Sequence, residues 1–158
     1  MTRFVLTDPA ACIGCRTCEA ACALEHATAA HPFSSRLQVL RLDHLSVSLM
    51  CHQCENAPCV SACPVGALTM GASRVEADSS RCIACQGCVV ACPFGAISIA
   101  LSAQRTPLIV KCDLCEHREQ GPACVDVCPT SAITLMTRES VAELQQKRMK
   151  ASARLLSP

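Results

Sequence analysis

The chain has 158 residues, a formal net charge of +1 and 16 cysteines, but only three Phe and neither Trp nor Tyr. This length suits one domain or two small intertwined ones, and the near-neutral charge argues against a nucleic-acid-binding surface. No apolar run in the sequence approaches the roughly 18 residues of a membrane-spanning helix. Because large packing residues are so few, we expect cysteine chemistry to organise the fold.

The N-terminal segment, MTRFVLTDPAACIGC, has no apolar stretch before a small-residue cleavage site and no twin-arginine pair. Secretion signals carry such features. We therefore predict a cytoplasmic protein that inserts into no membrane directly and reaches one only through a partner. Because the cytoplasm keeps thiols reduced, a disulfide scaffold is not expected.

The cysteines form four motifs, each of which begins with C-x2-C and ends with C-x3-C, so that only the middle gap varies. Motif one holds Cys12, Cys15, Cys18 and Cys22; motif two holds Cys51, Cys54, Cys59 and Cys63; motif three holds Cys82, Cys85, Cys88 and Cys92; motif four holds Cys112, Cys115, Cys124 and Cys128. No cysteine lies outside them. Such internal repetition indicates a repeated structural unit.

The segments that follow the motifs also repeat. Motifs two, three and four continue as CPVGALTM, CPFGAISI and CPTSAITL. Each predicts a short helical turn that contains C-x3-C, an exit directed by proline and then a short strand. Motif one departs from this pattern because Ala23 follows Cys22, so its helix is expected to run longer and to stop near Pro32.

Strands are also predicted between the motifs. Residues 36–49 alternate apolar and polar side chains, which is typical of a pair of half-buried strands. Residues 70–80 predict a turn and a short strand. Residues 102–107 predict a polar loop, and residues 107–110 a strand that leads into motif four.

A terminal helix is predicted after motif four. Ser140 and Glu143 form a capping-box pattern at its start. Cations that complement the helix dipole lie toward its other end, at Lys147, Arg148, Lys150 and Arg154. We interpret this segment as a solvated terminal helix, with docking to a partner as the alternative.

The spacing C-x2-C-x2-C-x3-C-P is typical of bacterial ferredoxins that hold two [4Fe–4S] clusters. Three thiolates on one tight loop reach three corners of a cluster, and the fourth, on the helical turn, ligates the neighbouring cluster. The proline then turns the chain out of the helix. Sixteen cysteines accordingly predict four [4Fe–4S] clusters, with all sixteen as iron ligands.

Zinc is the main alternative, since C-x2-C pairs also build zinc ribbons. Zinc explains neither the third cysteine of each loop nor the Cys-Pro exits. Histidines are not needed as ligands, and we expect them to be solvated or to lie beside the ligands: His26, His31, His44, His52 and His117.

Loading the clusters changes the charge. Four [4Fe–4S] centres with thiolate ligands shift the net charge by about −8, to roughly −7. Each motif has one basic or titratable residue beside a ligand, and we predict that these offset the charge and tune the cluster potentials, unless they are only solvated surface charges. They are Arg16, His52, Arg81 and Lys111.

With these motifs, the chain resembles the four-cluster ferredoxin-like electron-transfer subunits of molybdopterin oxidoreductases. It is most similar to the iron–sulfur subunits and accessory proteins of formate dehydrogenase and formate hydrogenlyase. The stretches that carry the resemblance are RFVLTDPAACIGCRTCEAAC, CHQCENAPCVSACPVGAL, CIACQGCVVACPFGAI and KCDLCEHREQGPACVDVCPTSAI.

The resemblance implies an α+β fold of two tandem ferredoxin-like units, one of residues 1–45 plus 105–158 and one of residues 46–104. It implies four ligand sets: Cys12, Cys15, Cys18 and Cys128; Cys112, Cys115, Cys124 and Cys22; Cys51, Cys54, Cys59 and Cys92; Cys82, Cys85, Cys88 and Cys63. The cysteine spacing itself equally allows motif one to pair with two, and three with four.

The function implied is electron transfer within a larger oxidoreductase, with no catalysis by this chain alone. The implied partners are a molybdopterin subunit like that of formate dehydrogenase, a hydrogenase subunit, or other iron–sulfur subunits. The alternatives are a free-standing polyferredoxin and an accessory protein for enzyme maturation. The sequence shows no G-x-G-x-x-G or P-loop motif, and no nucleophile–base pair stands out.

Overall fold

The computed structural model describes residues 3–28 and 34–155. Its strands form four two-stranded antiparallel sheets. The pairs are β1 (Phe4–Thr7) with β8 (Ile133–Met136), β2 (Leu37–Leu42) with β3 (Leu45–Met50), β4 (Leu68–Met70) with β5 (Val75–Ala77), and β6 (Ile97–Leu101) with β7 (Pro107–Lys111). The strand pair predicted in residues 36–49 is confirmed, and so are the single strands predicted in residues 70–80, in residues 107–110 and after motifs two, three and four.

The helices of motifs two, three and four are short, because each contains the third cysteine of its motif and ends before the fourth. The motif helices are α1 (Thr17–Glu25), α2 (Pro58–Ser61), α3 (Gly87–Ala91) and α4 (Ala123–Asp126), with a 3₁₀ turn, η1 (Ser79–Arg81). In α2 and α3 the cysteine that closes the motif follows the last helical turn, and the next residue is proline, which ends the helix.

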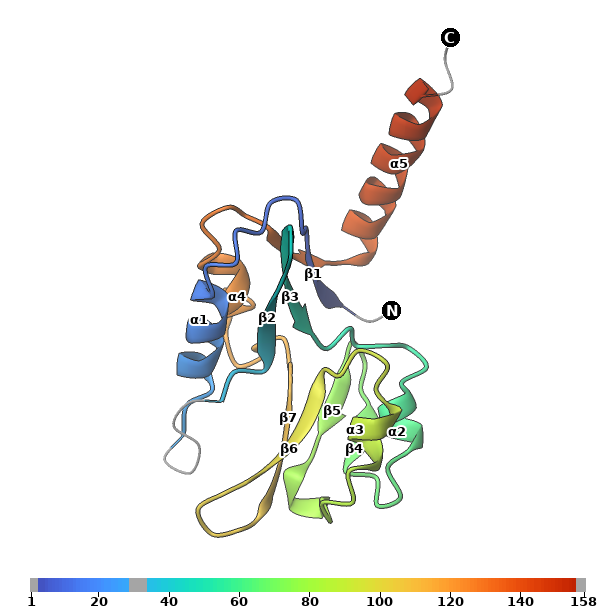
Figure 1. Cartoon of the computed structure of the whole chain (residues 1–158). Helices are drawn as coiled ribbons and strands as arrows, with labels where there is room; N and C mark the ends of the chain where they lie inside the picture. Colours follow the sequence, from blue (N-terminus) through green and yellow to red (C-terminus); the bar gives the residue numbers. More distant parts are fainter. Residues whose placement is uncertain (1–2, 29–33, 156–158) are drawn as a thin grey trace.

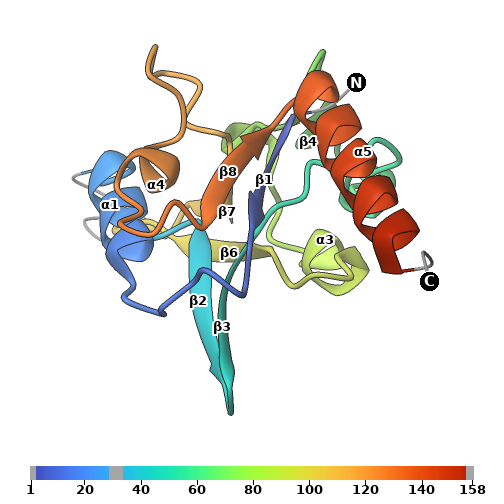
Figure 2. The ribbon, with the colours of Figure 1, turned by 90° about the horizontal axis from the view of Figure 1, so that it is seen from above.

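The first and last strands of the chain lie side by side. β1 pairs with β8 in the register Val5 opposite Leu135, and α1 packs against α4, so motifs one and four are neighbours. The helices α2 and α3 pack against each other in the same way, which brings motifs two and three together (Figure 1). Viewed from above, β1 lies between β8 and the β2–β3 hairpin (Figure 2).

Cysteines and small aliphatic residues fill two cores. The first core combines side chains such as Val5, Val39 and Ile133 with the thiols of motifs one and four. The second combines Leu68 and Val75 with the thiols of motifs two and three. A two-stranded sheet is at best marginally stable alone, so these cores must hold the sheets together.

Two predictions about helices are corrected. The helix of motif one ends at Glu25, well before Pro32, which lies outside the described residues. His26 caps it because its backbone N–H bonds the Cys22 carbonyl, and its ring contacts Asp113, 87 positions away. This long-range contact could not be inferred from local sequence.

The terminal helix α5 (Arg138–Leu155) begins earlier than predicted. Thr137, not Ser140, caps it: the Ser140 N–H donates to Thr137 Oγ1 at 3.4 Å, and the Thr137 N–H donates to Ser140 Oγ at 2.7 Å. Ser140 therefore takes the third position of the capping box. The helix has no buried residue and stands out from the body (Figure 1). No helix in the described ranges is long and apolar enough to cross a membrane.

Candidate metal centres

The four cysteine loops share one backbone feature. Two residues after the first cysteine, φ is positive in every motif: 66° at Gly14, 49° at Gln53, 57° at Ala84 and 63° at Leu114. Only one of these residues is glycine, and a left-handed conformation costs other residues about 1–2 kcal/mol. Such strain persists where the surrounding structure requires it, often at functional sites.

The left-handed turn directs backbone amides at sulfur. The N–H of Ala84 points at Cys82 Sγ at 3.4 Å, and that of Leu114 points at Cys112 Sγ at 3.4 Å. A second set of turns follows the Cys-Pro exits, where Gly66 has φ of 60° and the Ala67 N–H donates to Cys63 Sγ at 3.2 Å. Amides aimed in this way stabilise thiolates over thiols.

All sixteen cysteines are free thiols, so the structure contains no disulfide scaffold. Only Cys15 and Cys85 are exposed. Six are buried, and they come from the middle or end of their motifs: Cys18, Cys22, Cys59, Cys88, Cys115 and Cys124.

The thiols of motifs one and four are close enough to influence each other. Burial raises the pKa of Cys124, and the negative charges of Cys112, Cys22, Cys115 and Cys18 raise it further. The exposed Cys15 has Cys128 as its charged neighbour across the same pair of motifs.

The thiols of motifs two and three also affect each other's pKa. The pKa of Cys59 is raised by burial and then by Cys51 and Cys92, and that of Cys88 by burial and then by Cys82 and Cys63. A cavity is lined by four cysteines together with apolar side chains such as Val65 and Ile109. These cysteines are Cys63, Cys82, Cys85 and Cys88.

Cys112 and Cys51 join the two groups. Burial raises the pKa of Cys112 to about 12, and Cys51, from motif two, contributes to the rise. The loops of motifs two and four therefore meet at this point, although the two cysteines belong to different cores.

These pKa values constrain what the thiols can bind. Burial raises the pKa of Cys18 to about 11, so at neutral pH this thiol is protonated unless a cation lies beside it. A thiophilic metal centre supplies that positive charge and releases the protons. Clustered thiols with backbone amides directed at sulfur fit iron–sulfur chemistry.

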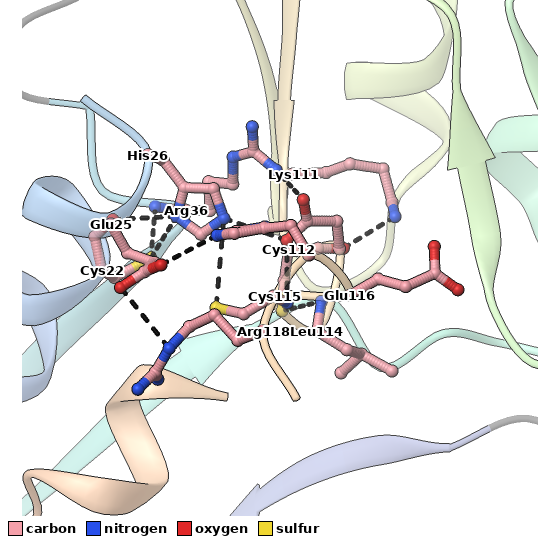
Figure 3. Close-up of polar contacts among 12 residues, drawn as sticks. Cys22, Glu25, His26, Arg36, Lys111, Cys112, Leu114, Cys115, Glu116 and Arg118 are labelled. Atoms are coloured by element: carbon pink, nitrogen blue, oxygen red, sulfur yellow. Dashed lines mark hydrogen bonds and ion pairs between the residues drawn. The ribbon is translucent and has the colours of Figure 1, made fainter. Parts of the chain in front are cut away.

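A charged cluster surrounds Cys22 and Cys115 (Figure 3). The His26 ring places Nδ1 at 3.7 Å from Cys22 Sγ and Nε2 at 4.0 Å from Cys115 Sγ. His26 Nε2 also lies 3.0 Å from Asp113 Oδ1, and Arg36 forms an ion pair with the other oxygen of that carboxylate. Although burial opposes it, Asp113 raises the pKa of His26 to about 12.

A family model described as a 4Fe-4S dicluster domain matches residues 42–138, and another described as a 4Fe-4S binding domain matches residues 9–25. The chain belongs to the 4Fe-4S dicluster domain family. The resemblance predicted from the cysteine motifs is thereby confirmed, and zinc and disulfide interpretations of the motifs are set aside.

Several proteins of Escherichia coli (strain K12) are similar to this family member. YsaA is 44% identical over 148 residues, covering 89% of this chain and 94% of that protein. Electron transport protein HydN is 36% identical over 176 residues, covering 97% and 98%. Formate hydrogenlyase subunit 2 is 37% identical over 180 residues, covering 94% and 88%.

The four predicted tuning residues of this 4Fe-4S protein lie in different surroundings. Arg16 is exposed and pairs with Glu19 at 3.8 Å. His52 stacks on Phe94 with ring centroids 4.0 Å apart. Arg81 is exposed and lies over Gly66. Lys111 alone is buried, with 3% of its surface exposed.

Sequence reasoning missed three residues around the cysteines. Asp113 and Arg36 pair beside Cys22, and Gln53, fully buried, bonds the carbonyl of Cys112. Asp113 and Gln53 lie inside C-x2-C loops, where a polar residue is usually solvated. Only their long-range contacts reveal a role. Among the predicted histidines, His31 lies outside the described residues, and His44 lines an open hollow beside Cys12.

Proposed function

We propose that this chain transfers electrons through four [4Fe–4S] clusters, as the iron–sulfur subunit of a complex of the formate dehydrogenase or formate hydrogenlyase type. Its membership of the 4Fe-4S dicluster family supports the cofactor. The names of its relatives, electron transport protein HydN and formate hydrogenlyase subunit 2, support the role and the kind of complex.

The sixteen cysteines are assigned to four cluster sites. Site A is Cys12, Cys15, Cys18 and Cys128; site B is Cys22, Cys112, Cys115 and Cys124; site C is Cys51, Cys54, Cys59 and Cys92; site D is Cys63, Cys82, Cys85 and Cys88. Mutual effects on thiol pKa within sites A to D, and the cavity lined by all four site D cysteines, support the sets.

The single observation that carries the proposal is that thiols assigned to neighbouring sites influence each other, which supports an arrangement of the four sites in a row. Cys124 of site B is influenced by Cys18 of site A, and Cys112 of site B by Cys51 of site C. Cys59 lies in α2, and Cys63 lies two residues after its end, so this one short segment serves sites C and D. The order A, B, C, D follows.

The ends of the row face solvent. The two exposed cysteines are Cys15 of site A and Cys85 of site D. Beside them lie exposed isoleucines, Ile13 and Ile83, at the same position of their loops. Sites B and C have no exposed cysteine. Partners that deliver and remove electrons would therefore dock at sites A and D.

Each residue class has a part in the transfer. A bound [4Fe–4S] cluster supplies one-electron reduction and oxidation without breaking bonds. The thiolates hold each cluster in place, the left-handed loops aim N–H groups at sulfur, and the apolar cores exclude water. Nothing here requires the chain to catalyse a reaction by itself, and we propose that catalysis belongs to a partner subunit.

Two ferredoxin-like units are proposed, with motifs one and four in one and motifs two and three in the other. The predicted division was residues 1–45 plus 105–158 and residues 46–104. The pairing of β3 with β2 and of β7 with β6 supports boundaries after Met50 and after Lys111 instead. We propose that the protein works in the cytoplasm.

An anaerobic affinity purification of the tagged chain from its native host tests the function. We expect a molybdopterin or hydrogenase subunit, or another iron–sulfur subunit, in stoichiometric amount. A brown protein that purifies alone and exchanges electrons with several enzymes would instead indicate a free-standing polyferredoxin.

A further inference from the structure

Lys111 is a buried cation at the junction between the two units. It ends β7, directly before Cys112. Its Nζ donates to the carbonyl of Val75 at 2.7 Å and to that of Cys112 at 2.8 Å, and it lies 3.4 Å from Gln53 Oε1. These oxygens satisfy its N–H groups. Among the described residues, no carboxylate lies within ion-pairing distance of it.

A buried ammonium without a counter-charge is costly, because neutral carbonyls replace only part of its hydration. A negative charge must therefore be close in the functional protein. The thiolates of sites B and C supply it. Lys111 directly precedes Cys112 of site B, and its Nζ lies 3.4 Å from the side chain of Gln53, which stands between Cys51 and Cys54 of site C.

Gln53 fixes the ammonium between these two sites. This side chain is fully buried, with 0% of its surface exposed. Its Nε2 donates to the Cys112 carbonyl at 2.7 Å, and its Oε1 accepts from the Val75 N–H at 3.0 Å. The Gln53 amide thus links the loops of motifs two and four to β5. The Lys111 ammonium contacts two of the same oxygens, Gln53 Oε1 and the Cys112 carbonyl. Figure 3 shows Lys111 extending from the Cys112 segment on the side away from His26.

We propose that Lys111 is a counter-ion shared by sites B and C, which Gln53 holds in place and which raises the reduction potential of both inner clusters. The proposal rests on the four-site assignment made above. A fixed positive charge favours the reduced, more negative state of each cluster it faces. Electrons crossing from one unit to the other would meet this charge at the crossing point.

The effect is selective because the two arginines predicted to tune the clusters lie in water. Arg16 and Arg81 are exposed beside the terminal sites A and D, where solvent and salt screen their charge. Lys111 is shielded from both. Sites B and C should therefore both respond to the loss of Lys111, and site B keeps the His26 ring beside Cys22 and Cys115 as a second charge. Sites A and D should depend little on their neighbouring arginines.

The test is an anaerobic redox titration of the purified holoprotein, followed by electron paramagnetic resonance, with dithionite donating one electron to each cluster. In Lys111→Met, we expect the reduced-to-oxidised ratio of two clusters to fall about tenfold at a fixed potential, equivalent to about 59 mV. The other two should not move. Arg105→Met, which removes an exposed cation from the β6–β7 turn, is the matched control, and Lys111→Arg should restore the wild-type values.

Gln53→Glu provides a second variant if Lys111→Met fails to load its clusters. It leaves the lysine in place and sets a carboxylate against it, so the same two potentials should fall. Whichever variant binds its clusters gives the result. If its potentials were unchanged, or if all four clusters shifted equally, the shared counter-ion would be overturned. A wild-type protein without four separable clusters would instead overturn the site assignment, and the two failures are thereby distinguished.

Discussion

The two halves of the molecule share the C-x2-C and C-x3-C pairs of their motifs, but the surroundings of these pairs differ. Around motifs one and four, charged side chains pair across the chain: His26 and Arg36 with Asp113, and Arg118 with Glu25 and Asp126. Around motifs two and three, the described residues show Arg74 with Glu76 as the internal ion pair, and the cavity at Cys63 and Cys85 is mainly apolar.

This difference matters because the potential of an iron–sulfur cluster depends on nearby charge, hydrogen bonds and exposure rather than on ligand spacing. Repetition of the motif therefore sets where four equivalent ligand loops lie, and the side chains between the cysteines make the sites unequal. The half with motifs one and four also has six-residue strands in β2 and β3, against three residues in β4 and β5. Its structure should depend less on bound iron.

Removal of the clusters should therefore produce the largest difference in stability between the two halves. After oxidation and chelation under denaturant-free conditions, we expect β4 and β5 to lose amide protection first, because a two-stranded sheet of this length is not stable without a packed core. The β2–β3 hairpin should stay protected longer. Hydrogen exchange measured by mass spectrometry on peptides from the two halves tests this, and equal loss of protection in both would contradict it.

Substitution of Asp113 should weaken the half that contains it. In Asp113→Asn, both His26 and Arg36 lose their anionic partner, at a cost of about 1–2 kcal/mol, between that of an exposed pair and that of a buried one. Loss of the visible cluster absorbance on heating should then begin at a lower temperature.

Asp43→Asn is the matched control for Asp113→Asn, because Asp43 is exposed in the turn between β2 and β3. Asp43→Asn removes the same negative charge but leaves the ion pairs of Asp113 with His26 and Arg36 intact. If both variants lost their clusters at the wild-type temperature, the charged network would have no stabilising role.

The smallest effect concerns the turns after the Cys-Pro exits. Gly66 and Gly95 have φ of 60° in one half, and Ser131 has φ of 51° at the equivalent position in the other. Ser131→Gly should raise the stability of the folded state by about 0.5 kcal/mol, since relief of strain exceeds the entropy cost of glycine.

The reverse exchange, Gly95→Ala, should cost about 1 kcal/mol. A Cβ at Gly95 meets no atom within 4 Å, so the cost would come from the backbone alone. Thermal unfolding of holoprotein samples measures both changes, and opposite signs in the two variants are the required result.

Much of the fold could be predicted because the motifs carry their own local physics. The C-x3-C turn, the proline that ends it and the alternation in residues 36–49 are local signals, and α2, α3, β2 and β3 follow from them. Residues whose partners lie far along the chain could not be predicted. His26 ends α1 early through Asp113, and Gln53 gains its role from Cys112, 59 positions away.

The tuning residues illustrate the same limit. Arg16, His52, Arg81 and Lys111 occupy comparable places beside cysteines in the sequence. Only the tertiary structure separates the buried Lys111 from the exposed Arg16 and Arg81. A position next to a cysteine therefore predicts that a charge lies near a cluster. Its burial determines how strongly that charge affects the reduction potential.

The most direct test of the central claim is the iron and acid-labile sulfide content of the anaerobically purified chain. A row of four [4Fe–4S] sites predicts about 16 iron and about 16 sulfide per chain, and about 12 of each in Cys85→Ser, which removes one ligand of site D alone. A wild-type content near 8 of each, or the same content in the variant with unchanged spectra, would contradict the four-site account.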